Sequence, residues 1–74
     1  MKGRYELNKK SLITGLVYDT KEVVMIRNPR QAAKYIYNGC TLYDLIADEN
    51  AVITYVFKRD EASHYYAKWL DGLL

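Results

Sequence analysis

The feature that most constrains this chain is a short segment, Asn28 to Gly39, which encodes both ends of a helix. The Asn28 side chain can accept a hydrogen bond from a free backbone N–H of the first turn. Pro29 follows at the first helical position, where its missing N–H costs nothing. Asn38 and Gly39 end the segment, because glycine adopts the left-handed conformation after a helix without a Cβ penalty. The segment therefore predicts one helix with defined ends.

The apolar residues of this segment predict its buried face. Ala32, Ala33 and Ile36 recur at helical spacing, and Tyr37 can extend the stripe. A second helix is predicted from Asp60 onward, because its apolar residues also follow the helical period. These residues are Ala62, Tyr65, Tyr66, Trp69, Leu70 and Leu73. We expect the aromatic members of this set to pack on a sheet rather than to bind a ligand.

Two hairpins are predicted around the first helix. The runs 12–18 and 23–27 are rich in β-branched and aromatic residues and flank the polar stretch 19–22, which is typical of a hairpin. Gly15 within the first run indicates a bulge, a close backbone approach or an ordinary weak point in the strand. The second hairpin joins the runs 41–47 and 51–58 through a turn at 48–50.

The order β-β-α-β-β-α predicts an α+β fold. We expect a two-layer sandwich with a largely antiparallel four-stranded sheet and two helices on one face. The single domain is predicted over residues 11–74, preceded by a flexible basic lead-in over residues 1–10. That lead-in carries four cationic residues against Glu6 alone, so a basic arm for nucleic acid is a second interpretation of it.

Composition excludes several classes of protein. The 74 residues suffice for one domain, and eleven basic residues against nine acidic ones do not indicate a nucleic-acid binder by charge alone. Cys40 is the only cysteine, so no intrachain disulfide forms and a reducing compartment fits best. The longest strongly apolar run, 51–57, is too short to span a bilayer. We expect a cytoplasmic protein with no membrane partner.

Part of the chain resembles a known group of proteins. The run VVMIRNPRQAAKYIYNGCTLYDLI, the later VFKRDE and the late Trp69 are similar to a pattern in small proteins of phages and prophages of low-GC Gram-positive bacteria. Such families are largely domains of unknown function. The resemblance implies a mobile-element origin, an accessory role and the cytoplasm of a bacterial host, and it transfers no active-site residue.

The residues that carry enzyme chemistry are sparse. His64 and Cys40 are the only residues of their kinds, whereas a metal site needs three or four ligands. A dyad of these two would still need an orienting third group and an oxyanion site. The glycines are isolated, so there is no phosphate-binding loop. The sequence therefore predicts a non-enzymatic protein with no catalytic residue, cofactor or metal.

One remaining hypothesis is nucleic-acid binding. Arg27, Arg30 and Lys34 lie around the Asn28 cap, where cations and backbone N–H groups together can hold a phosphate. Tyrosines between these cations could stack on single-stranded bases. The alternative is an ordinary solvated helix face.

The favoured hypothesis is a protein-binding module, including the inhibitor type that occupies a surface of a host or defence protein, as anti-CRISPR proteins do. The run 51–58 is apolar on both faces, yet a two-layer fold covers only one face of its sheet. We therefore expect a binding face, used by a homodimer or a protein target, with Tyr55 near its centre if Val52 and Val56 face the helices. The expected residues are Ile53, Tyr55, Phe57 and Tyr43. Alternatively, the N-terminal segment folds back over this face.

Overall fold

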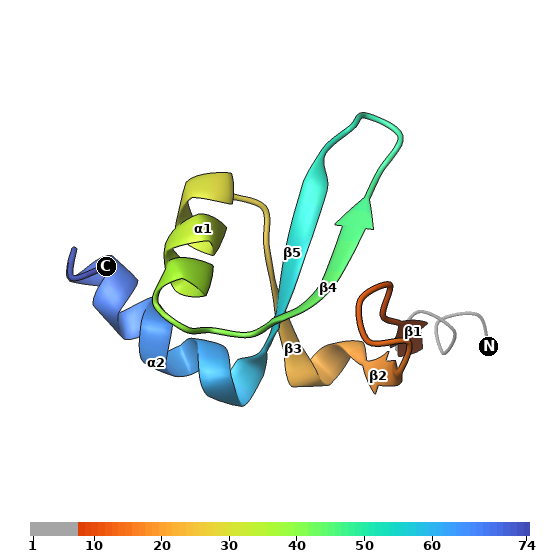
Figure 1. Cartoon of the computed structure of the whole chain (residues 1–74), viewed down its shortest axis with the longest axis horizontal. Helices are drawn as coiled ribbons and strands as arrows, with labels where there is room; N and C mark the ends of the chain where they lie inside the picture. Colours follow the sequence, from red (N-terminus) through yellow and green to blue (C-terminus); the bar gives the residue numbers. More distant parts are fainter. Residues whose placement is uncertain (1–7) are drawn as a thin grey trace.

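The computed structural model describes residues 8–74, which form an α+β fold (Figure 1). In chain order its elements are β1 (Asn8–Lys10), β2 (Val17–Asp19), the 3-10 turn η2 (Thr20–Glu22), β3 (Val23–Ile26), α1 (Pro29–Tyr37), β4 (Leu42–Ala47), β5 (Ile53–Lys58) and α2 (Arg59–Leu70). Most of the predicted lead-in, residues 1–7, lies outside the described residues. Its last three residues form β1.

The strands of the described residues form two antiparallel sheets, one of three strands in the order β3-β5-β4 and one in which β1 pairs with β2. The predicted α+β class is confirmed, whereas the predicted single four-stranded sheet is not. The predicted hairpin between 12–18 and 23–27 is wrong, because β2 pairs with β1 while β3 pairs with β5.

A turn at Ser11 explains why that hairpin does not form. Ser11 Oγ accepts hydrogen bonds from the N–H groups of Ile13 and Thr14, at 3.0 and 2.9 Å, and its carbonyl accepts from Gly15 N–H at 3.0 Å. Gly15 has a φ of +77°, and a Cβ on it would meet no described atom within 4 Å. Its role is therefore the left-handed turn rather than a close approach. Residues 11–15 form a turn, so the strand that follows begins only at Val17.

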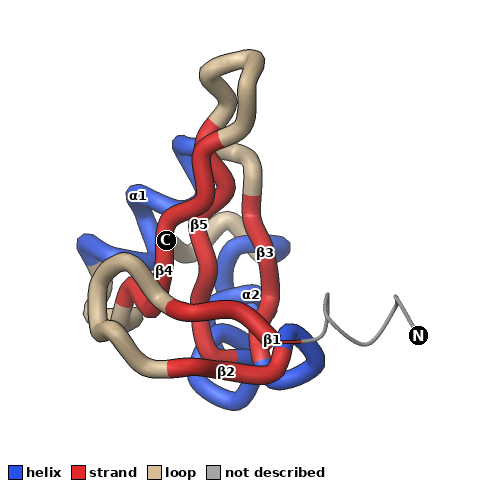
Figure 2. The backbone as a smooth tube through the Cα atoms, turned by 90° about the vertical axis from the view of Figure 1, so that its right-hand side faces the viewer, coloured by secondary structure: helices blue, strands red, loops and turns tan. Residues whose placement is uncertain are grey.

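The elements form three layers instead of the expected two. Both helices lie on one side of the three-stranded sheet (Figure 1). On the other side, β1 and β2 run across the strands of that sheet (Figure 2). The N-terminal alternative considered above is therefore the arrangement found: residues 8–19 fold over the face opposite the helices.

The predicted ends of α1 are confirmed. Asn28 Oδ1 accepts hydrogen bonds from Arg30 N–H at 3.0 Å and from Gln31 N–H at 3.3 Å, and Pro29 occupies the first turn. Gly39 has a φ of +108°, and its N–H donates to the Ile36 carbonyl at 3.0 Å. Both caps are local, which is why the sequence alone identifies them.

The buried face of α1 differs from the predicted one. Ala32 is buried as expected, but its companion is Tyr35, whereas Ala33, Ile36 and Tyr37 are exposed. The Tyr35 ring packs on Phe57 at a centroid distance of 5.4 Å, and its hydroxyl accepts a hydrogen bond from Gln31 Nε2 at 3.0 Å. Because that hydroxyl has a partner, the ring can be fully buried, which a hydropathy pattern does not reveal.

A bulge in β4 decides which side chains reach the face opposite the helices. Leu42 is opposite Phe57, but Asp44 is opposite Val56, so Tyr43 is the extra residue. Leu42 packs with the core beneath the helices, while Tyr43 packs with the second core formed by Tyr18, Val23 and Val56. The bulge also turns the Asp44 side chain toward Tyr18 on this second face.

The Asp44 carboxylate joins residues 8–19, the N-terminal layer, to the three-stranded sheet. It is 2% exposed, and it accepts hydrogen bonds from the Tyr18 hydroxyl at 2.5 Å and from the N–H groups of Leu12 and Leu45, both at 2.8 Å. Burial would raise the pKa of Asp44, but these hydrogen bonds, with the charge of Lys9, outweigh burial and hold that pKa below its ordinary value. Burial and the bond to Asp44 raise the pKa of Tyr18.

We predict that Asp44→Asn destabilises the protein at pH 7 by about 1–3 kcal/mol, because it removes the charge that accepts these bonds. The folded-state pKa of Asp44 lies below its unfolded value near 3.8. The stability that Asp44 contributes is therefore present above that value and is lost as the pH falls through the folded-state pKa. Urea unfolding between about pH 2 and 7 measures the free energy of unfolding. As the pH falls, this free energy should decrease less for Asp44→Asn than for the wild type. Asp71→Asn, at an exposed position, is the control. Identical acid profiles for Asp44→Asn and the wild type would contradict this role.

We also predict that Gly39→Val destabilises the protein by about 1 kcal/mol or more, because a β-branched residue is strained at this φ. A Cβ at this position would also lie 3.3 Å from the Tyr65 hydroxyl oxygen. Gly15→Val is the control, since it shares the backbone strain but meets no described neighbour. Thermal unfolding measures both variants. A Gly39→Val protein as stable as the wild type would contradict the left-handed cap.

Candidate protein-binding groove

The two edges of the three-stranded sheet differ in whether other parts of the chain contact them. Along β4, the Tyr43 carbonyl accepts a hydrogen bond from Ser11 Oγ at 2.7 Å, and the Leu45 N–H donates to the Asp44 carboxylate. The Ser11 bond places the N-terminal layer against part of this edge, whereas the Leu45 bond is internal to β4. Within residues 8–74, β3 pairs only with β5, so its other side is a sheet edge. Such an edge offers unpaired backbone groups to another strand.

The hydrogen bonds of β4 show how β3 is oriented. Leu45 is opposite Tyr55, but the Leu45 N–H is bonded to Asp44 instead of to β5. The Leu45–Tyr55 pair is thus not a hydrogen-bonded pair, and the backbone groups of Tyr55 face β3. Tyr55 is opposite Ile26. Ile26 therefore directs its backbone N–H and carbonyl toward β5.

Alternation along β3 then places the backbone groups of Met25 on the open side. Val24 shares the orientation of Ile26, two residues away, whereas Val23 and Met25 face outward. An independent contact agrees: the Val23 carbonyl accepts a hydrogen bond from Arg59 Nη2 at 2.9 Å. Arg59 thus covers the first outward carbonyl of β3, and Met25 follows as the next outward residue.

A groove of about 570 Å³ lies between this edge and the helices. This volume is within the range of ligand-binding clefts. Its lining comes from β3, from the connection between β3 and α1, and from one side of each helix. The lining residues are Val24, Met25, Ile26, Arg27, Asn28, Gln31, Tyr35, Arg59, Ala62, Ser63 and Tyr66. Tyr66 is 52% exposed, so the groove presents apolar surface to solvent, while Met25 contributes its backbone to the groove, because its side chain shares the face of Val23.

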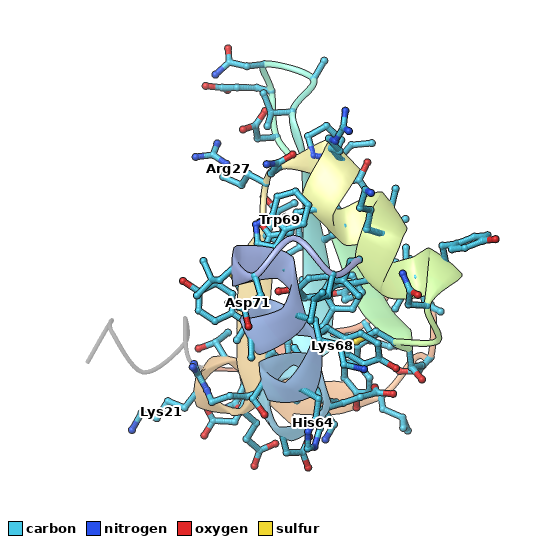
Figure 3. The ribbon with its side chains drawn as sticks, turned by 90° about the vertical axis from the view of Figure 1, so that its left-hand side faces the viewer. Lys21, Arg27, His64, Lys68, Trp69 and Asp71 are labelled. Carbon is cyan, nitrogen blue, oxygen red and sulfur yellow. The ribbon has the colours of Figure 1, made fainter. Side chains whose placement is uncertain are left out.

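Two arginines mark the ends of the groove. Arg59 is held by two backbone carbonyls, since its Nε donates to Lys21 O at 3.2 Å and its Nη2 to Val23 O. Arg27, at the other end of β3, has a side chain that is 66% exposed. Figure 3 shows Arg27 and Lys21 pointing outward at opposite ends of the same side of the molecule. The described lining residues include no carboxylate, so the groove itself is positively charged.

The groove does not have the arrangement of an active site. Ser63 Oγ donates to the Asp60 carbonyl of its own helix at 3.0 Å, and the Tyr35 hydroxyl is bonded to Gln31. Cys40 lies outside the groove and is buried, and burial, with the Glu61 carboxylate, raises its thiol pKa to about 11. A thiol with a raised pKa is a poor nucleophile near neutral pH. His64 is exposed on α2 (Figure 3) and does not line the groove.

The predicted protein-binding residues do not share one face. Phe57 is fully buried and Tyr55 is half-buried, and both pack in the core beneath the helices. Tyr43 packs with the second core, on the opposite side of the sheet. Ile53 is 42% exposed near the β4–β5 turn. The stated condition for Tyr55, that Val56 faces the helices, is not met, because Val56 packs with the second core.

The predicted phosphate-binding residues are partly engaged elsewhere. Lys34 Nζ donates to the Leu74 carbonyl at 2.8 Å, and Arg27 pairs with Asp48. The Asn28 side chain already accepts from the two N–H groups that a phosphate would need. Arg30 is exposed. This arrangement does not favour a phosphate site, and nucleic-acid binding stays an untested prediction.

A second exposed apolar surface lies on the Ser11 turn. Its residues are Leu12, Ile13, Leu16 and Val17, between 48% and 82% exposed. This loop is separate from the groove, and nothing in the structure shows what covers it. The groove is the stronger candidate because it combines a cleft, apolar side chains and outward backbone groups.

No sequence pattern indicated a binding role for Met25, Arg59 or Tyr66. No local signal separates Tyr66 from Tyr65, because neighbouring residues of a helix can belong to the same apolar face. Tyr65 packs in the core and Tyr66 lines the groove. The open side of Met25 depends on strand pairing with a partner about thirty positions away, which no local pattern reveals.

Comparisons with known proteins add no relative. No protein-family model matches the chain, and no curated protein or solved structure matches it either. Neither described helix is long and apolar enough to cross a bilayer. Within residues 8–74, no group of three or more His, Cys, Asp or Glu side chains could hold a metal ion. Function is therefore inferred from the geometry of the described residues.

We predict that Tyr55→Lys destabilises the protein by about 1–3 kcal/mol, because it places an ammonium group in the core beneath the helices. Ile53→Lys is the matched control, two residues along the same strand and more exposed. Chemical denaturation measures both. If Tyr55→Lys were no more destabilising than Ile53→Lys, Tyr55 would be a surface residue, and the binding face predicted from the sequence would regain support.

Proposed function

We propose that this protein is a non-enzymatic protein-binding module that binds a segment of a partner protein in the groove beside β3. The observation that carries the proposal is the open edge of β3 at Met25, which forms one wall of the groove. An extended segment can add to such an edge as a fourth strand, with backbone hydrogen bonds supplying affinity. Its alternate side chains would enter the groove and supply specificity.

The shape of the groove supports strand addition. Val24 and Ile26 direct their side chains into the core beneath the helices, while α2 provides Ala62 and Tyr66 as a second wall. Every second side chain of an added strand would therefore lie against α2. A tyrosine is well suited to this position, because its ring supplies contact area and its hydroxyl can bond a polar partner.

We further propose that the protein comes from a phage or another mobile element and acts in the cytoplasm of a bacterial host. The sequence resemblance supports this origin. A small domain without catalytic machinery can act by occupying a surface of a larger host or defence protein, and an edge strand provides a way to do so. The alternative is that the β3 edge pairs with the β3 edge of a second copy of the chain to form a homodimer.

Substitution of Met25 by proline tests strand addition directly. The Met25 N–H faces away from β5, so proline removes an outward donor without breaking the ladder. Random peptides about ten residues long, roughly one strand with flanks, would be selected by display against the wild-type protein. We predict that Met25→Pro weakens binding of the selected peptides about tenfold or more, measured by fluorescence anisotropy, because a backbone hydrogen bond is lost and the ring obstructs the edge.

Met25→Leu is the control, since it keeps the N–H and nearly the same volume. Thermal unfolding would verify that both variants are folded. Peptides that bind Met25→Pro as tightly as Met25→Leu, or a selection that yields no binding peptide, would contradict the proposed function.

A further inference from the structure

We propose that the groove selects an acidic strand: an extended segment of a partner protein that places a carboxylate side chain on Arg27. This inference rests on the proposed function and adds the chemistry of the occupant. Its basis is the charge of the groove, whose described lining residues include Arg27 and Arg59 and no carboxylate. An acidic segment complements that charge, and a basic one would be repelled.

Arg27 is the residue that can contact a ligand. Its Nη2 lies 3.6 Å from Asp48 Oδ2, beyond the usual length of a charge-assisted hydrogen bond. Both side chains are well exposed, at 66% and 39%, so solvent and salt screen this pair. A carboxylate placed beside the groove could therefore compete with Asp48 for the guanidinium. Arg59, in contrast, is committed to the carbonyls of Lys21 and Val23.

The other charges around the groove place the carboxylate at the Arg27 end. At the Val23 end, Glu22 and Asp60 lie near Lys58 and Arg59, so the charges there are mixed. At the Arg27 end, Asp48 is the carboxylate that pairs with Arg27, and its Oδ1 is occupied by the N–H groups of Asn50 and Val52. The acidic side chain of the occupant is therefore expected near the C-terminal end of β3.

The position of Arg27 also fixes the spacing within the occupant. Arg27 follows Ile26, the last residue of β3, and is two residues beyond Met25. An added strand that pairs with Met25 advances about 3.3 Å per residue, so a residue about two positions along the strand reaches Arg27. The expected pattern is an apolar residue that packs against Tyr66 and a carboxylate close to it in sequence.

Two substitutions change the charge at Arg27 in opposite directions. Arg27→Gln removes the guanidinium. Asp48→Asn removes the competing carboxylate but keeps the Oδ1 acceptor that the turn uses. Arg30→Gln is the matched control, because Arg30 is a nearby exposed arginine outside the groove lining. The probes are a display-selected peptide and its version with each Asp or Glu replaced by Asn or Gln.

We expect the selected peptides to be enriched in Asp and Glu. Arg27→Gln should lower the affinity for the acidic peptide about tenfold, because one charge-assisted hydrogen bond is lost. The affinity for the amide version should not change. Asp48→Asn should strengthen binding of the acidic peptide, and Arg30→Gln should have little effect on it. The difference between Arg27→Gln and wild type should shrink as salt is raised.

The outcomes separate this inference from the proposed function. In one outcome, the selected peptides lose affinity for Met25→Pro, contain no excess of Asp and Glu, and bind Arg27→Gln and Arg30→Gln equally well. That result would overturn the preference for an acidic strand and would leave the proposed strand addition intact. Peptides that are insensitive to Met25→Pro would overturn both. Sedimentation that shows a dimer broken by Met25→Pro would assign the groove to a second copy of the chain and would also overturn the inference.

Discussion

The arrangement of this protein depends on one buried carboxylate. Asp44 accepts hydrogen bonds from the Tyr18 hydroxyl and from the N–H groups of Leu12 and Leu45. The bonds from Tyr18 and Leu12 fasten residues 8–19 to the face of the sheet that the helices leave open. A buried charge is tolerated only when it is fully hydrogen-bonded. Asp44 has such partners from both layers, so losing the N-terminal layer would leave the carboxylate without part of its bonds. The two layers are therefore expected to unfold together.

This attachment also determines where a partner can bind. The Tyr18 ring packs edge-on against Tyr43 at 5.3 Å, which closes over the second core. The Ser11 turn reaches the carbonyl of Tyr43 and occupies part of the β4 edge. The backbone of β3, by contrast, keeps an open side next to an apolar groove. A fold that covers one edge and leaves the other beside a cleft is suited to strand addition.

Local signals predicted much of the fold. The caps of α1 at Asn28 and Gly39 and the β4–β5 hairpin lie within short stretches of sequence, where turn and cap chemistry decides the structure. The errors arose from contacts between distant residues. Asp44 and Tyr18 are 26 positions apart, and their bond selects the face that the bulged strand presents. Alternation alone could not reveal this, because one extra residue inverts which side chains face the core.

The candidate site was predicted less well for the same reason. Tyr55 and Phe57 were expected on a surface because their strand is apolar on both sides, and the layer that covers the second side could not be identified from the sequence. Arg27 was recognised as a binding residue, although for a phosphate rather than for a protein segment. The role of Met25 depends on which partner β3 pairs with, and that partner follows about thirty residues later.

Amide hydrogen exchange of the free protein tests the open edge most directly. Native-state exchange measured by NMR reports each backbone N–H of β3 separately. The N–H groups of Val24 and Ile26 face β5 and should exchange slowly, whereas the Met25 N–H between them should exchange far faster. Equal protection of all three would show that the edge is already covered, and it would contradict strand addition at β3.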